Sequence, residues 1–188
     1  MRATRAGQSA LLLLDVVEVL SEAGIRYAVL GAMAASVHGI VRASLDADAV
    51  AFIGVPQAQA LLDSLTAAGF NTSLRRGDPD DPIAALLAVE DAHGNRVDLL
   101  VGLRGLTRAA LDRAIEVPFE GASLTVLDRE DFIATKLFAG GPQAMADAAA
   151  AILMNATTLD LPLLRELARS YGHETADRLA RLLATHST

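Results

Sequence analysis

The sequence predicts a mixed α/β (α+β) fold, in which a β-sheet is flanked by helices and followed by a helical C-terminal segment. Short β-capable runs alternate with helical runs in residues 1–127, whereas residues 128–188 show an almost continuous helical pattern. The chain has 188 residues, 52% of them hydrophobic and only 4% aromatic, so its core must consist mainly of small aliphatic side chains. We therefore expect an α/β core over residues 1–127, with the helical segment 128–188 packed on it.

The first elements are expected to be a helix, a strand and a second, short helix. Apolar positions recur at helical spacing over residues 10–23, and Ser9 in front of them is a suitable N-cap. Residues 25–30 form a β-capable run that ends at Gly31, and residues 32–37 return to a helical pattern. This order predicts a strand, a tight turn and a short helix.

A strand, a helix and a further strand are expected next. Residues 45–53 are β-like, and Pro56 stands where the first turn of a helix tolerates proline, so we expect a helix that runs to Gly69. Residues 70–74 are again β-capable. The loop 77–82 holds three aspartates and two prolines, a composition that predicts a solvated connection.

A β-hairpin is the clearest local prediction. Residues 83–90 and 96–101 are two β-like runs, and the spacer Asp-Ala-His-Gly-Asn between them is rich in turn residues and has hairpin length. A helix over residues 106–115 and a last strand over residues 122–127 are expected to follow it.

Composition and charge exclude several classes of protein. The formal net charge of −7, from 23 acidic and 16 basic residues, argues against a histone-like binder that neutralises phosphates along a nucleic acid. The absence of cysteine excludes disulfides, thiolate metal sites and cysteine nucleophiles. No apolar stretch approaches the roughly 18 residues of a membrane span. We expect a cytoplasmic protein with no membrane contact.

Three aspartates are candidates for a cation site. Asp46 and Asp48 are two residues apart on a predicted strand, so both project from the same face and repel each other unless a metal, a proton or an arginine intervenes. An exposed strand face is the alternative explanation of this pair. Asp98 lies in an otherwise apolar strand, where a carboxylate needs a partner. If the two strands are adjacent, the three carboxylates suit one or two magnesium ions that hold a triphosphate.

These residues resemble the nucleotidyltransferase-fold superfamily, and within it the AbiEii-like, minimal nucleotidyltransferases of toxin-antitoxin systems. The similarity covers roughly residues 25–152 and follows the order of the family's landmarks. These landmarks are Gly31-Ala32 after a strand, His38-Gly39, the run from Arg42 to Asp48, Arg96-Val97-Asp98, and the run from Glu130 to Leu137 with Asp147 after it.

The resemblance implies transfer of a nucleoside monophosphate from a nucleoside triphosphate (NTP) to an acceptor hydroxyl, which is left open between RNA, a protein side chain and a small molecule. Asp46, Asp48 and Asp98 would be both the catalytic residues and the ligands of Mg²⁺ or Mn²⁺. Residues that would contact the nucleotide are Gly31, Ala32, Arg42, Ser44 and Lys136. Lys136, the one lysine among 16 basic residues, is expected to point from the first turns of a helix toward the carboxylates.

Two other interpretations remain open at this level. Ala32, Gly141 and Ala144 stand where the family has a second glycine or a serine, an arginine and an aspartate, and these departures favour a catalytically inactive binding or regulatory module. Its partner would be a cognate toxin or antitoxin protein. The third interpretation is an acidic α/β domain that binds no nucleotide and keeps its aspartates for architecture.

Overall fold

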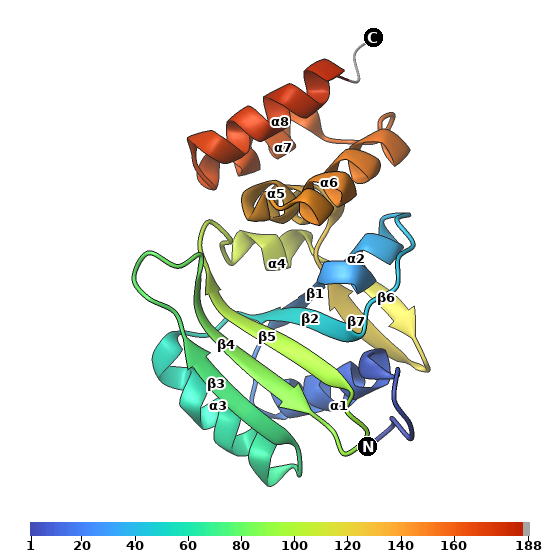
Figure 1. Cartoon of the computed structure of the whole chain (residues 1–188), viewed down its shortest axis with the longest axis vertical. Coiled ribbons are helices and arrows are strands. Elements are labelled where there is room, and N and C mark those ends of the chain that lie inside the picture. Colours follow the sequence, from blue (N-terminus) through green and yellow to red (C-terminus); the bar gives the residue numbers. More distant parts are fainter. Residues whose placement is uncertain (186–188) are drawn as a thin grey trace.

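The structure, a computed structural model, describes residues 1–185. Its strands form one mixed sheet in the order β3-β4-β5-β2-β1-β7-β6 (Figure 1). The strands are β1 Tyr27–Leu30, β2 Asp46–Ala51, β3 Asn71–Arg76, β4 Ile83–Glu90, β5 Arg96–Leu103, β6 Ile115–Phe119 and β7 Ala122–Val126. β2 pairs with β1 in antiparallel and with β5 in parallel orientation, so it lies at the centre of the sheet.

Helices cover the sheet unevenly. They are α1 Ser9–Glu22, α2 Gly31–Val37, α3 Val55–Ala67, α4 Ala109–Arg113, α5 Arg129–Ala139, α6 Pro142–Met154, α7 Leu161–Ser170 and α8 His173–Thr185. α1 and α3 pack on the strands β2 to β5, whereas α2 contacts β1 and β2. α5 packs against α6, α7 and α8, and Figure 1 shows these four helices stacked beyond α4.

The two faces of β5 differ in burial. Val97, Leu99 and Val101 are fully buried, whereas Asp98 and Leu100 between them are partly exposed. Successive side chains of a strand point to opposite faces of the sheet. The apolar residues therefore form the core with α1 and α3, and Asp98 lies on the more open face.

Local sequence signals account for the boundaries of the C-terminal helices. Asp128 caps α5, because its side chain accepts a hydrogen bond from the backbone N–H of Asp131. Gly140 ends α5 in the left-handed conformation at φ 67°, and Pro142 occupies the first turn of α6. The chain thus reverses between the two helices within a few residues.

The structure corrects two expectations about elements. Ser9 is the first residue of α1 and not its N-cap, and its hydroxyl instead donates to the carbonyl of Leu45. The helix expected over residues 106–115 is reduced to Ala109–Arg113, and Ile115–Phe119 forms the strand β6. Residues 115–119 form a strand because they pair with β7. This pairing cannot be read from the sequence of residues 115–119 alone.

Among the described residues, no helix combines the length and the apolar character that a membrane crossing requires.

Candidate active site

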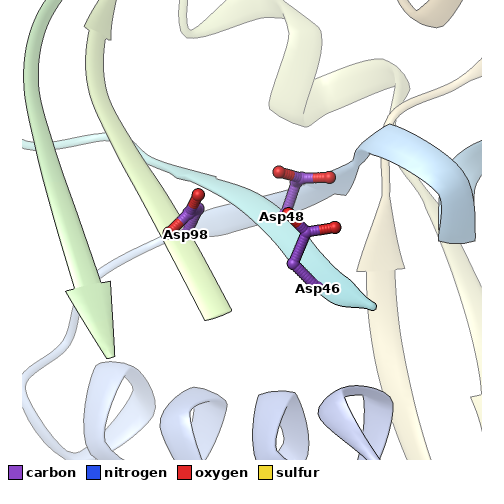
Figure 2. A group of neighbouring side chains, drawn as sticks. All are labelled: Asp46, Asp48 and Asp98. Atoms are coloured by element: carbon purple, nitrogen blue, oxygen red, sulfur yellow. The ribbon is translucent and has the colours of Figure 1, made fainter. Parts of the chain in front are cut away.

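Two neighbouring parallel strands bring the three aspartates together. Asp48 of β2 lies directly opposite Asp98 of β5, and Asp46 lies on the same face of β2, two residues before Asp48. One carboxylate oxygen from each residue lies within 4.8 Å of the other two. Figure 2 shows the side chains of Asp46 and Asp48 rising from β2, with that of Asp98 beside them on β5. The convergence expected from the sequence is therefore present.

The surroundings of Asp48 disfavour its ionised form. Burial, followed by the charges of Asp46 and Asp98, raises the pKa of Asp48 to about 6, although Lys136 and Arg42 partly oppose this shift. Each of the other two carboxylates has a nearby donor. The hydroxyl of Ser44 donates to Asp46 Oδ1 at 2.6 Å, and Arg96 pairs with Asp98. The cluster thus has more negative charge than its neighbours compensate.

Gly31 makes room for the Asp48 carboxylate. Its backbone has φ +68°, and a Cβ placed on it would lie 1.9 Å from Asp48 Oδ2. The position therefore excludes a side chain both by its conformation and by the lack of space. Ala32, the next residue, is 5% exposed and lines a pocket beside Asp46.

Lys136 and Arg42 meet on a buried acid. Lys136 Nζ lies 2.8 Å and Arg42 Nε 3.5 Å from the same Oδ2 atom of Asp147, whose side chain is 1% exposed. Burial opposes ionisation of Asp147, but the contacts with Lys136, Gln143 and Arg42 hold its pKa below the usual range. Lys136 lies in the last turn of α5, not in its first turns as expected. Asp147 therefore connects α5 and α6 to the segment that precedes β2.

A pocket of about 180 Å³ opens beside Asp46. Its lining comes from the N-terminal segment, the start of α1, α2, the segment before β2 and the start of β2. The lining residues are Gly7, Ser9, Ala10, Ala32, Met33, Ser36, Arg42, Ser44, Asp46 and Ala47. The N-terminal residues were not expected here from the sequence. Since pockets that enclose drug-sized ligands start at about 300 Å³, this pocket suits a phosphate or a sugar and leaves the rest of a nucleotide in the open. A larger hollow of about 300 Å³ near Phe52 and Gly102 lies at the other end of β2 and β5.

The residues present fit a hard divalent cation. Mg²⁺ prefers carboxylate oxygens, and these three converge from two rigid strands. Burial raises the pKa of Asp48 most, and the charges of Asp46 and Asp98 raise it further. A bound cation would relieve both effects, because it supplies the positive charge that the ionised carboxylates lack.

Arg96 is the neighbour of the site for which the sequence suggested no role. Its guanidinium donates to both oxygens of Asp98, with Nε–Oδ1 at 2.8 Å and one terminal nitrogen at 3.2 Å from Oδ2. The sequence feature that could have indicated this pair is the spacing of Arg96 and Asp98, because residues two apart on a strand lie on the same face.

Known structures share this fold, although no model of a protein family and no curated protein matches the chain. An antigenic nucleotidyltransferase-like protein from Paracoccidioides brasiliensis has 16% identity and a TM-score of 0.62, over 98% of this chain and 91% of its own. ANT(2″)-Ia, in complex with adenylyl-2″-tobramycin, has 13% identity and a TM-score of 0.59, and the alignment covers 90% of this chain and 96% of ANT(2″)-Ia. A nucleotidyltransferase-like structure from Thermotoga maritima has 12% identity and a TM-score of 0.56, and the alignment covers 81% of this chain and 96% of that protein. The chain therefore has the nucleotidyltransferase fold, as the resemblance of its sequence implied.

Proposed function

We propose that this chain is a metal-dependent nucleotidyltransferase, which moves a nucleoside monophosphate from an NTP to an acceptor hydroxyl. The observation that carries the proposal is the convergence of Asp46, Asp48 and Asp98 on one sheet face of this fold. Asp46 and Asp48 would hold Mg²⁺ or Mn²⁺, and Asp98 would complete the site. When bound, the metal ion would neutralise charge on the triphosphate and polarise the phosphate that is attacked.

The residues of the chain supply position and proton transfer. Asp98 accepts the proton of the acceptor hydroxyl as the acceptor oxygen bonds to the α-phosphorus. The bond from that phosphorus to the bridging oxygen of the β-phosphate breaks, and pyrophosphate leaves with the bonding electrons. Lys136 and Arg42 place positive charge near the phosphates. Gly31, Ala32 and Ser44 form the wall along which the nucleotide lies.

The acceptor hydroxyl belongs to RNA, a protein side chain or a small molecule. The structure of ANT(2″)-Ia contains adenylyl-2″-tobramycin, which makes hydroxyl-bearing small molecules the first class to test. We also propose that the chain belongs with the AbiEii-like nucleotidyltransferases of toxin-antitoxin systems, on the motifs from Gly31 to Asp147, and that it acts in the cytoplasm.

An inactive module is the second candidate function. Ala32 lines the pocket without the hydroxyl or second glycine that the family has there. Gly141, directly before α6, and Ala144 in α6 stand where the family has an arginine and an aspartate. Such a module would bind a nucleotide and a cognate toxin or antitoxin protein without transfer.

The test is transfer of label from each of the four α-³²P NTPs, with magnesium, to total RNA, to cell protein and to a set of hydroxylated small molecules. We expect one nucleotide and one acceptor class to become labelled, and Asp48→Asn to abolish the transfer. Nucleotide binding without transfer would select the inactive module. Absence of both nucleotide and metal binding would reject the two candidates together.

A further inference from the structure

Arg96 already occupies the carboxylate that the proposed metal needs. Its guanidinium contacts both oxygens of Asp98, at 2.8 and 3.2 Å. Such a two-point pair is the strongest geometry that an arginine makes with a carboxylate. The side chain of Asp98 is only 16% exposed, whereas that of Arg96 is 47% exposed. Asp98 is therefore held in place, and Arg96 has open space into which it can move.

Two further acids lie next to Arg96. The strand register places Arg96 between Asp46 on β2 and Glu90 on β4, with all three residues on one sheet face. The charges of both acids act on Arg96 in addition to that of Asp98. Glu90 is exposed, so it is free to receive a guanidinium that has left Asp98.

A divalent ion weakens the interaction of Arg96 with Asp98 when both bind that carboxylate. Two positive groups on one carboxylate repel each other, and the repulsion is relieved if the arginine leaves. The alternative role of Arg96 is to stay on Asp98 and orient it toward the metal, as the outer partners of metal ligands do. The two roles predict opposite effects of removing Arg96.

We propose that Arg96 is a built-in counter-ion, which occupies Asp98 in the metal-free protein and moves to Glu90 when the divalent ion binds, and so sets the metal affinity. This inference rests on the proposed function, because it takes Asp46, Asp48 and Asp98 as the metal site.

The experiment is calorimetric titration of the full chain with Mn²⁺ alone, in the wild type, Arg96→Gln and Arg75→Gln. Arg75 belongs to the same sheet face two strands away, so Arg75→Gln removes the same charge without touching Asp98. We expect Arg96→Gln to bind Mn²⁺ about tenfold more tightly and Arg75→Gln to change the affinity less than about twofold. Arg96→Lys, which keeps the charge but loses the two-point contact, should lie between them.

Glu90 tests the second half of the proposal. Glu90→Gln should weaken Mn²⁺ binding in the wild type by a larger factor than in Arg96→Gln, because Glu90 acts through Arg96. Equal factors in the two backgrounds would refute the movement to Glu90. Weaker or unchanged Mn²⁺ binding by Arg96→Gln would overturn the counter-ion role. Absence of Mn²⁺ binding in every variant, Arg96→Gln included, would instead reject the proposed function.

Discussion

Gly31 links the backbone of the chain to the geometry of the carboxylates. A Cβ at this residue would overlap Asp48, and φ is +68°. Gly24 has nearly the same φ, +66°, with no atom near its Cβ position. We expect Gly24→Ala to cost about 1 kcal/mol, the strain of the left-handed conformation alone. Gly31→Ala should cost clearly more in urea unfolding and should also remove the stabilisation by magnesium. An equal cost at both positions would contradict the role assigned to Gly31.

Removing the negative charge of Asp48 is expected to stabilise the metal-free protein, although most substitutions of buried residues destabilise a fold. Its raised pKa of about 6 means that the folded protein binds a proton more tightly than the unfolded chain does. The stability contributed by this proton is present below pH 4 and is lost as the pH rises through 6. Without metal at pH 8, Asp48→Asn should therefore stabilise the fold, by about 1 to 3 kcal/mol.

The measurement is thermal unfolding with a chelator at pH 4 and pH 8. The advantage of Asp48→Asn should disappear at pH 4, and Asp80→Asn in the exposed loop should show none at either pH. A destabilised Asp48→Asn at pH 8 would mean that the carboxylate is held for architecture, since an aspartate with good partners loses stability on this change.

At the scale of elements, the Asp147 contacts join α5 and α6 to the site. Asp147 is 1% exposed and Lys136 lies 2.8 Å from it, so Lys136→Met leaves a buried charge with Arg42 alone as its cation. We expect the free energy of unfolding in urea to fall by about 3 kcal/mol, and to fall less for the double variant Lys136→Met with Asp147→Leu, which leaves no unpaired buried carboxylate. A double variant less stable than Lys136→Met would show that the pair stabilises the fold by itself.

The start of α5 contains a titratable cap. Burial, together with the charges of Asp131 and Glu130, raises the pKa of Asp128 to about 7. Stability tied to its proton is present below pH 4 and is lost as the pH rises through 7. Asp128→Asn keeps a cap oxygen, and it should gain about 1 kcal/mol at pH 8 after allowance for solvent screening.

Urea unfolding at pH 5 and pH 8 checks this expectation. Asp160→Asn is the matched control, because Asp160 caps α7 in the same way, through the backbone N–H of Leu163. A gain for Asp128→Asn that is the same at both pH values would exclude the titration of Asp128 as its cause.

For the whole molecule, metal binding should appear as stability. If magnesium binds with a Kd of about 1 mM, about 10 mM of it stabilises the fold by roughly 1.4 kcal/mol. In a chain of this size that raises Tm by roughly 3 to 6 °C. Sodium chloride at equal ionic strength should not reproduce the shift, and Asp48→Asn should lack it. A shift that sodium chloride reproduces would be general screening and not a site.

The relation of sequence to structure differs between the carboxylates and their neighbours. The i, i+2 spacing of Asp46 and Asp48 is enough to place them on one strand face. Asp98 was identified because it interrupts an apolar strand. No such local signal links Lys136 or Arg42 to Asp147, since these residues come from α5, the segment before β2 and α6. Sequence reasoning gave Lys136 a nucleotide role and did not find its pairing with Asp147.

The sequence alone determined the features that have a local signal: the hairpin of β4 and β5, the glycine at which β1 passes into α2, the helical C-terminal segment and the common face of Asp46 and Asp48. Tertiary structure decided the order of the strands, the existence of β6 and the parallel pairing that brings Asp98 beside Asp48. It also decided the raised pKa of Asp48 and the hold of Arg96 on Asp98. The physical reason is range: side-chain alternation and turn preferences act within a few residues, whereas strand pairing and burial depend on segments that are tens of residues apart.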